Sequence, residues 1–325
     1  MNQKERGVAL LEELDFLLSI CREMIPGKGE DSYCHSFRED AGLLAVFDGC
    51  GGAGARAHDF YSGRTEAYMA SRLCAGAFYD TFRSCQAGVI PTAQQLADAA
   101  LQRLRAYTPP QEAGSFAIQG SMVRTLPTTA AAAVISRDEQ GLLVTVAWAG
   151  DSRVYLLDDQ GLAQLTEDDT SVPDPMENVY EDGILRNVFC ADRDVKLRSA
   201  TVRPQLPFAL FCATDGCFGY VSTPMEFEGM LLQALLSAES PAQWEQDLVQ
   251  RIGAVAGDDH CLCLASFGYG SFEALQQRMR PRFAWLQQYF LEPVSKLPLE
   301  DRISRFGLWQ QYREPYFRFW KGGQA

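Results

Sequence analysis

Short runs of apolar residues, each bounded by polar or glycine-containing segments, recur along the chain. Runs of this length and composition are typical of buried strands. Tight connections such as residues 138–141 join the central runs into successive strands. The pattern predicts strands at residues 42–48, 129–136, 142–150, 152–159, 208–216 and 260–267.

Other segments space their apolar residues three or four apart, which predicts amphipathic helices. The first is residues 7–24, where this spacing places four side chains on one face: Leu10, Leu14, Leu17 and Cys21. Further helices are predicted at residues 62–85, 92–106, 223–237 and 241–256.

Two segments differ from this alternation of strands and helices. Residues 166–192 are polar, acidic and interrupted by prolines, which predicts a long surface loop or flap. The tail after residue 268 is rich in aromatic residues and basic, and Trp309, Tyr312 and Tyr316 recur at helical spacing. We expect a helical extension that packs on the preceding domain, or else docks a partner or regulates activity.

Composition narrows the possible partners and location. The 325 residues carry a net charge of −13, which argues against nucleic acid or an anionic membrane as a partner. No segment resembles a membrane span or a signal peptide, so we expect a cytoplasmic protein. The ten cysteines form no Cys-x-x-Cys pair, and the three histidines are scattered. We therefore expect free, mostly buried thiols in a reducing compartment and no zinc site.

Carboxylates stand at the ends of several predicted strands, and they are the candidate chemistry of this sequence. They are Asp48, Asp151, Asp215 and Asp259, joined by the pair Glu30-Asp31. Aspartate is common in turns, so the preference for turns is enough to explain any one of these residues alone. If the strands lie side by side, however, the carboxylates converge, and packed like charges repel one another.

Divalent cations would relieve that repulsion. Ligand sets made only of oxygen favour hard ions, Mn²⁺ or Mg²⁺, over zinc. Two such ions roughly 3.5–4 Å apart activate a water and hold a phosphate for in-line attack. The sequence contains no convincing catalytic triad, nucleophile elbow or P-loop that would compete with this hypothesis.

The motifs around these carboxylates resemble those of the metal-dependent serine/threonine protein phosphatases of type 2C, bacterial members included. The similar motifs follow one another in the family's order over residues 28–268: GEDSY (29–33), VFDGCGG (46–52), TTAAAAVI (128–135), AWAGDSRVYLL (147–157), LTEDDT (165–170), LRNVF (185–189), LFCATDGCFGYVS (210–222) and GDDHCLCLAS (257–266). The resemblance implies an α+β fold in which a β-sandwich of two antiparallel sheets is flanked by helices. Residues 1–27 would be an N-terminal helix and residues 269–325 an extension outside that fold.

The resemblance also implies roles for the carboxylates. Asp48 would bridge two metal ions, with the Gly49 carbonyl on the first, and Asp215 and Asp259 on the second. Asp151 matches the ligand of a third, weaker ion, while Glu30 and Asp31 would hold metal-bound waters. The activity implied is hydrolysis of phosphoserine and phosphothreonine in proteins.

The sequence departs from the family pattern at three positions. Cys50 stands where many members have a histidine that serves as general acid, and His260 replaces an asparagine. The arginine that binds substrate phosphate, a few residues before Glu30, is missing. Lys28, Arg56 or Arg64 could supply the charge instead, although an exposed cation is more often only solvated.

Three functions remain open at this point. The first is an active protein phosphatase, the second a pseudophosphatase or regulatory binding module, and the third a phosphatase of small phosphate esters. Metal-dependent turnover separates the second from the others.

Overall fold

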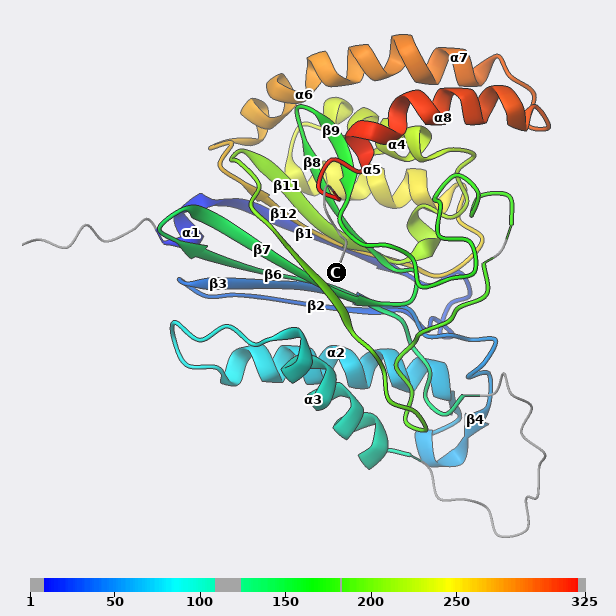
Figure 1. The fold of residues 1–325 in the computed structure, drawn as a ribbon. Helices are drawn as coiled ribbons and strands as arrows, with labels where there is room; N and C mark the ends of the chain where they lie inside the picture. Colours follow the sequence, from blue (N-terminus) through cyan, green and yellow to red (C-terminus); the bar gives the residue numbers. More distant parts are fainter. Residues whose placement is uncertain (1–8, 109–123, 182, 321–325) are drawn as a thin grey trace, which may run out of the picture.

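A computed structural model describes residues 9–108, 124–181 and 183–320 of the chain. Two five-stranded antiparallel sheets lie face to face at its centre, and helices cover the outer side of each (Figure 1). The strand orders are β1-β12-β11-β8-β9 in the first sheet and β10-β7-β6-β3-β2 in the second. The predicted α+β sandwich of two antiparallel sheets with a helical C-terminal region is confirmed.

Six of the ten strands in the two sheets lie at the predicted positions, whereas the other four, β1, β2, β9 and β10, were not predicted as strands. The first sheet contains β1 (Leu14–Arg22), β8 (Arg153–Asp158), β9 (Gly161–Gln164), β11 (Phe208–Ala213) and β12 (His260–Phe267). The second contains β2 (Ser32–Phe37), β3 (Ala41–Phe47), β6 (Ala130–Asp138), β7 (Gly141–Ala149) and β10 (Arg198–Val202). A separate ribbon pairs β4 (Ala57–His58) with β5 (Arg64–Thr65).

The helices divide between the two sides of the sandwich. The second sheet is covered by α2 (Glu66–Ser84) and α3 (Ala93–Ala106). The first sheet is covered by α4 (Pro224–Ser237), α5 (Pro241–Gly253), α6 (Phe272–Leu286), α7 (Glu292–Ser295) and α8 (Arg302–Tyr316). Short elements complete the chain: α1 (Leu10–Glu13), η1 (Asp59–Tyr61), η2 (Asp215–Cys217) and the π-helical turn η3 (Gln287–Leu291). None of the described helices has the length and apolarity needed to cross a bilayer.

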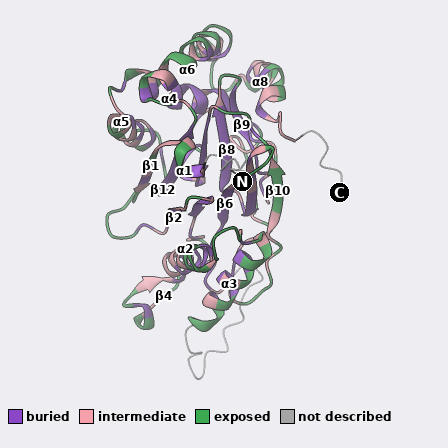
Figure 2. Cartoon of the chain, turned by 90° about the vertical axis from the view of Figure 1, so that its left-hand side faces the viewer, coloured by how far each residue is buried: buried purple, intermediate pink, exposed green. Residues whose placement is uncertain are grey.

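Three apolar layers hold the sandwich together, and β3 shows why its sequence is continuously apolar. Leu44 and Val46 point between the two sheets, whereas Leu43 and Phe47 point to the layer beneath α2 and α3. Successive strand residues face opposite sides, so a strand covered on both faces needs apolar residues at every position. Figure 2 shows the resulting block of buried sheet between partly exposed helices.

The helix predicted over residues 7–24 is wrong for most of its length. Only Leu10–Glu13 are helical, and Leu14–Arg22 form strand β1, which pairs antiparallel with β12. Leu17, expected on the buried helix face, is 36% exposed, whereas Leu18 and Ile20 are buried in alternation. The four-residue spacing was coincidental, because pairing with the edge of β12 satisfies the backbone and buries the alternate side chains.

The expectation that all cysteines are free is also wrong. Cys21 and Cys261 lie opposite one another on β1 and β12 and form a disulfide. Directly opposed residues of antiparallel strands bring their Cβ atoms close together, and only the strand register reveals that proximity. The remaining cysteines are free thiols, as expected, and most of them are buried.

The predicted flap lies between β9 and β10 and is anchored to its neighbours rather than loose. Its described residues form no regular helix or strand, but Thr170 and Leu185 form an isolated bridge. Asn178 donates to Asp168, and Trp309 of α8 donates through its indole N–H to Asp174 over 3.4 Å. The C-terminal extension therefore contacts this segment directly.

Candidate active site

Asp48 is held at the end of β3 by the two residues immediately before β6. Its backbone carbonyl accepts hydrogen bonds from the Thr129 N–H at 2.8 Å and the Thr128 hydroxyl at 2.7 Å. Its own N–H donates to the Thr129 hydroxyl at 3.2 Å. Gly49 follows in a space that excludes any side chain, because a Cβ there would lie 2.5 Å from the carbonyl oxygen of Ala67. The carboxylate thus projects from a turn whose backbone is fixed.

Asp215 and Asp259 are brought together by the neighbouring strands β11 and β12. Asp215 opens the short helix η2 directly after β11, and Asp259 immediately precedes β12. Gly216 lets the two backbones touch, since a Cβ there would lie 1.9 Å from the carbonyl oxygen of Asp259. In this conformation the Asp259 carboxylate accepts from the Met24 N–H at 2.7 Å and the Glu30 N–H at 2.6 Å.

Glu30 and Asp31 connect β1 and β2 across the same end of the sandwich. The buried Asp31 carboxylate accepts from the Thr214 hydroxyl at 2.7 Å, one residue before Asp215. Glu30 accepts a hydrogen bond from the Thr65 hydroxyl at the start of α2. Burial raises the pKa of Glu30, and the charge of Asp259 raises it further, against the lowering effect of the Thr65 bond.

The carboxylates perturb one another, which shows that they converge. Burial raises the pKa of Asp48, Asp31 and Asp151 well above the ordinary aspartate value, and neighbouring carboxylates add to each shift. Burial likewise raises the pKa of Asp215, while a hydrogen bond with Asp48 lowers it. Asp48 and Asp215, which follow strands of opposite sheets, therefore lie close to one another at the same end of the sandwich.

Arg153 is a buried cation beside this cluster, but its charge is directed elsewhere. Its guanidinium makes a bidentate ion pair with Asp168, with N–O distances of 2.9 and 2.6 Å. Asp151, two residues before it, retains a buried oxygen, Oδ1, with no hydrogen-bond partner among the described residues. An orphaned buried carboxylate oxygen is costly unless a cation or an ordered water meets it.

The side chains of the described segments include no set of three or more His, Cys, Asp or Glu residues already arranged to hold a metal ion. Both Asp259 oxygens accept from backbone N–H groups instead. The donor set nevertheless fits a hard divalent cation, because it consists of carboxylate oxygens that repel one another and includes the orphaned Asp151 oxygen.

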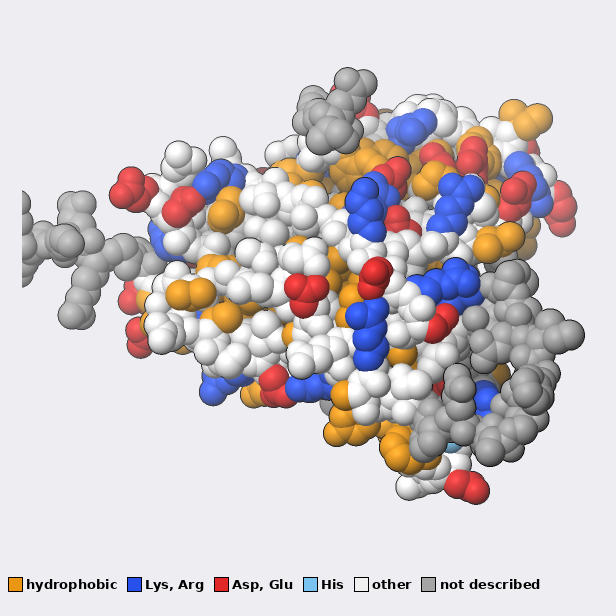
Figure 3. All heavy atoms as spheres, turned by 60° about the horizontal axis from the view of Figure 1, so that its bottom comes forward, with side chains coloured by type: hydrophobic (Ala, Val, Ile, Leu, Met, Phe, Trp, Pro, Cys, Tyr) orange, Lys and Arg blue, Asp and Glu red, His pale blue; other side chains and the backbone are white. Residues whose placement is uncertain are grey.

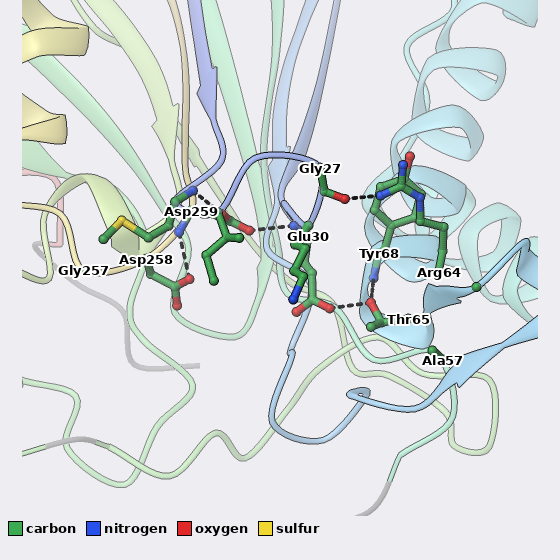
Figure 4. Close-up of a pocket in the computed structure, with 13 residues that line it drawn as sticks. Gly27, Glu30, Ala57, Arg64, Thr65, Tyr68, Gly257, Asp258 and Asp259 are labelled. Carbon is green, nitrogen blue, oxygen red and sulfur yellow. Dashed lines mark hydrogen bonds between the residues drawn. The ribbon is translucent and has the colours of Figure 1, made fainter.

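Two cavities open on either side of the carboxylates. One, of about 520 Å³, is lined by Glu30, Asp258 and Asp259 together with Lys28 and Arg64, and Figure 4 shows it in close-up. Lys28 and Arg64 thus reach the site region, whereas Arg56 does not line this cavity.

The other cavity, of about 270 Å³, lies between Asp151, Asp215 and five residues of the flap: Pro175, Asn178, Val179, Gly183 and Leu185. The flap therefore forms one wall of the space beside the carboxylates.

Sequence reasoning missed three contributors to this region. Asp258 raises the pKa of several carboxylates, and its place in the tandem Asp258-Asp259 was an available signal. Arg72 donates to the carbonyls of Gly29 and Glu30 from α2, at 3.1 and 3.3 Å. The Arg153–Asp168 pair spans two motifs, and nothing in the sequence indicated that its members meet.

The two unusual residues of the site are both uncharged in their surroundings. Burial raises the pKa of the Cys50 thiol well above its ordinary value, and the charge of Asp48 raises it further, which favours the protonated thiol over the nucleophilic thiolate. Burial lowers the pKa of His260, whose Nε2 atom has no hydrogen-bond partner among the described residues.

Gly216→Ala is expected to destabilise the protein by about 1–3 kcal/mol, because the added methyl must displace the backbone of Asp259. Gly253→Ala at the end of α5 is the matched control, since its Cβ meets nothing within 4 Å. That control is expected to be neutral or to stabilise by up to about 1 kcal/mol. Urea denaturation of both variants measures the difference, and equal stabilities would contradict the close packing of the two loops.

Comparison with known proteins places this chain in a family. A model of the protein phosphatase 2C family matches residues 28–252. No curated protein sequence matches significantly. Solved structures do match the fold, among them several bacterial serine/threonine phosphatases.

Stp1 from Staphylococcus aureus is 19% identical, with a TM-score of 0.57 over 78% of this chain and 96% of that one. PstP/Ppp from Mycobacterium tuberculosis is 20% identical, with a TM-score of 0.54 over 77% and 97%. A PstP catalytic domain solved with two manganese ions is 18% identical, with a TM-score of 0.51 over 78% and 97%. Since the family model covers more than half of the sequence and the sandwich agrees with it, the chain belongs to the protein phosphatase 2C family.

Proposed function

We propose that this protein is a metal-dependent phosphatase that hydrolyses phosphoserine and phosphothreonine in proteins. The observation that carries the proposal is the set of buried carboxylates that raise one another's pKa at one end of the sandwich. Arg153, the cation that lowers the pKa of Asp215, is paired with Asp168. Such a cluster is stabilised by added cations, and membership of the phosphatase family supplies the reason for it.

The residues that would hold Mn²⁺ or Mg²⁺ follow from their positions. Asp48, with the Gly49 carbonyl, Asp215 and Asp259 would hold two ions, and Asp151 a third. Glu30 and Asp31 would hold coordinated waters. When bound, the ions activate a water and neutralise the charge of the phosphate.

The chain itself orients the carboxylates and favours water over a protein side chain as the nucleophile. Thr128 and Thr129 fix the backbone of Asp48, and Thr214 holds Asp31. The protonated Cys50 leaves attack to water, in keeping with a reaction that needs no protein nucleophile.

The substrate class is proposed from the family and from the surface. We infer that phosphorylated proteins, rather than nucleic acids, are the substrates, and that the protein acts in the cytoplasm. On the face that Figure 3 shows, acidic and basic side chains are interspersed and no large basic patch is present. Lys28, which lines the larger cavity, is the candidate for contacts to phosphate.

We also infer that the C-terminal extension is part of the catalytic unit and not a separate docking module. Its α8 residues Trp309, Tyr312 and Tyr316 are buried in the same apolar cluster as α4 and β8. The Tyr316 hydroxyl donates to Gln164 of β9 at 2.9 Å. These contacts support residues 28–268 and the extension acting together.

Hydrolysis of a chromogenic phosphate ester with Mn²⁺, with and without chelator, tests the proposal. We expect turnover that chelator abolishes, and a thermal unfolding temperature that rises by several degrees with Mn²⁺, because a ligand of the folded state stabilises it by about 2.7 kcal/mol at a hundredfold excess over Kd.

The other outcomes distinguish the alternatives. Mn²⁺ stabilisation without turnover of the ester or of phosphopeptides would favour a pseudophosphatase. Turnover of the ester, but of no peptide in a phosphopeptide panel, would favour a phosphatase of small esters. The absence of both Mn²⁺ stabilisation and turnover would contradict the metal site itself.

A further inference from the structure

The larger cavity beside the carboxylates has two chemically different ends. Glu30, Asp258 and Asp259 form one end, and Arg64 lies at the other, on the far side of Glu30 (Figure 4). The lining of the cavity also includes three side chains with apolar surface: Met24, Ile25 and Tyr68. Met24 and Ile25 are 54% and 56% exposed. With a volume of about 520 Å³, the cavity has room for more than the phosphoryl group itself.

Arg64 is held rigidly at its end of the cavity. Its guanidinium lies over the Tyr68 ring, 4.5 Å from the centroid, and its Nη1 donates to the Gly27 carbonyl. The opposite anchor is Arg72, which lies 3.6 Å from the same ring centroid and donates to the Gly29 and Glu30 carbonyls. An arginine fixed in this way loses little conformational entropy when it binds a ligand.

The charge of Arg64 is available to a ligand. No carboxylate of the described segments forms an ion pair with it, and the one hydrogen bond that it donates to them goes to a neutral carbonyl. Lys28 lines the same cavity, is exposed, and likewise has no ion-pair partner within those segments. A planar guanidinium with free N–H groups matches the oxygens of a carboxylate or a phosphate.

We propose that Arg64 selects substrates in which an acidic group, a carboxylate or a second phosphate, flanks the phosphorylated residue to be hydrolysed. This inference rests on the proposed function. The scissile phosphate lies at the carboxylate end, and the substrate chain runs across the cavity to the end where Arg64 lies on Tyr68. Its anionic neighbour then reaches Arg64, which acts as a specificity-determining residue.

Three phosphoserine peptides that differ only beside the phosphoserine test this assignment: one with alanine, one with glutamate and one with a second phosphoserine. We expect kcat/KM of the natural enzyme to favour one or both acidic peptides over the alanine peptide by about tenfold, through KM. In Arg64→Gln, which keeps a donor for Gly27 but removes the charge, this ratio falls towards one. Comparison of the glutamate peptide with the peptide that has a second phosphoserine shows whether Arg64 prefers a carboxylate or a phosphate.

Arg83→Ala is the matched control, because Arg83 is an exposed arginine of α2 that does not line the cavity. It is expected to keep the tenfold ratio. Arg64→Lys keeps the charge but not the planar guanidinium, so its ratio of kcat/KM values should lie between those of Arg64→Gln and Arg83→Ala.

Binding of the same peptides to Asp48→Asn, with and without Arg64→Gln, gives the ratio of Kd values independently of turnover. Equal kcat/KM and equal Kd for the alanine and acidic peptides, or a ratio unchanged by Arg64→Gln, overturns the assignment. Failure of the proposed function is a different result, namely no Mn²⁺-dependent turnover of any substrate, and the Kd ratio still decides the role of Arg64 in that case.

Discussion

Asp48→Asn is expected to lower the Mn²⁺-dependent kcat/KM for phosphopeptides by more than about 100-fold. Mutation of residues that merely orient metal ligands already lowers metal affinity or activity roughly 10- to 100-fold. The substitution removes one of the carboxylate oxygens that would hold the ions and leaves the backbone of the turn intact. Initial rates over a range of Mn²⁺ concentrations measure the loss, and they show whether excess metal restores activity.

The same variant is expected to be more stable than the natural protein when both are free of metal. Burial and the neighbouring carboxylates raise the folded-state pKa of Asp48, so the folded protein binds more protons than the unfolded chain. Its stability therefore falls as pH rises from about 4, the ordinary aspartate pKa, through the raised folded value. Asparagine removes this contribution, so the gain in stability should be present at pH 7 and should vanish near pH 4.

Together these two results separate a functional loss from a folding defect. Thermal unfolding in chelator, at several pH values, provides the control. An Asp48→Asn variant that is less stable than the natural protein at pH 7 would contradict the repulsion inferred among the carboxylates, whatever its activity.

Glu228→Ala is expected to destabilise the protein by about 3–5 kcal/mol, because it leaves a buried arginine without its partner. The Glu228 side chain of α4 is fully buried and accepts from Arg282 of α6 at 2.6 and 2.8 Å, and from the Tyr312 hydroxyl of α8. The Arg282 side chain is only 7% exposed. Urea denaturation measures the loss.

Asp80→Ala is the matched control for this prediction. Asp80 forms an ion pair with Arg103 between α2 and α3, but its side chain is 62% exposed. Exposed pairs contribute about 1 kcal/mol or less, so the control should be nearly neutral. The double variant Glu228→Leu/Arg282→Met should recover much of the lost stability, since an apolar pair needs no charge compensation. Equal effects of Glu228→Ala and Asp80→Ala would show that the extension adds little to the fold.

Arg282 also explains how the extension is tied to the sandwich. A Cβ at Gly161, the first residue of β9, would lie 2.2 Å from the Nη2 atom of Arg282, so the guanidinium packs directly on the end of the β8–β9 turn. Gly161 has φ +104°, a conformation that favours glycine. The glycine both makes the turn and admits the arginine. At the other end of the extension, Phe306 stacks on Tyr180 of the flap, with ring centroids 6.2 Å apart.

The sequence by itself determined the parts of this protein that depend on local pattern. Continuous apolar runs marked strands such as β3 and β12, because a strand covered on both faces needs apolar residues throughout. Because the apolar runs also marked where the strands end, the carboxylates at those ends could be identified from the sequence. The order of the motifs indicated the family, which the family model then confirmed.

Only the tertiary structure decided the features that arise between segments. Residues 14–22 became a strand because the edge of β12 was available for pairing, and the same register joined Cys21 to Cys261. The hydrogen bonds from Arg64 to Gly27 and from Arg72 to Gly29 and Glu30 likewise depend on how α2 meets the loop before β2. Local sequence specifies the period of apolar positions, whereas partners, register and the direction of a charged side chain are set by contacts between distant residues.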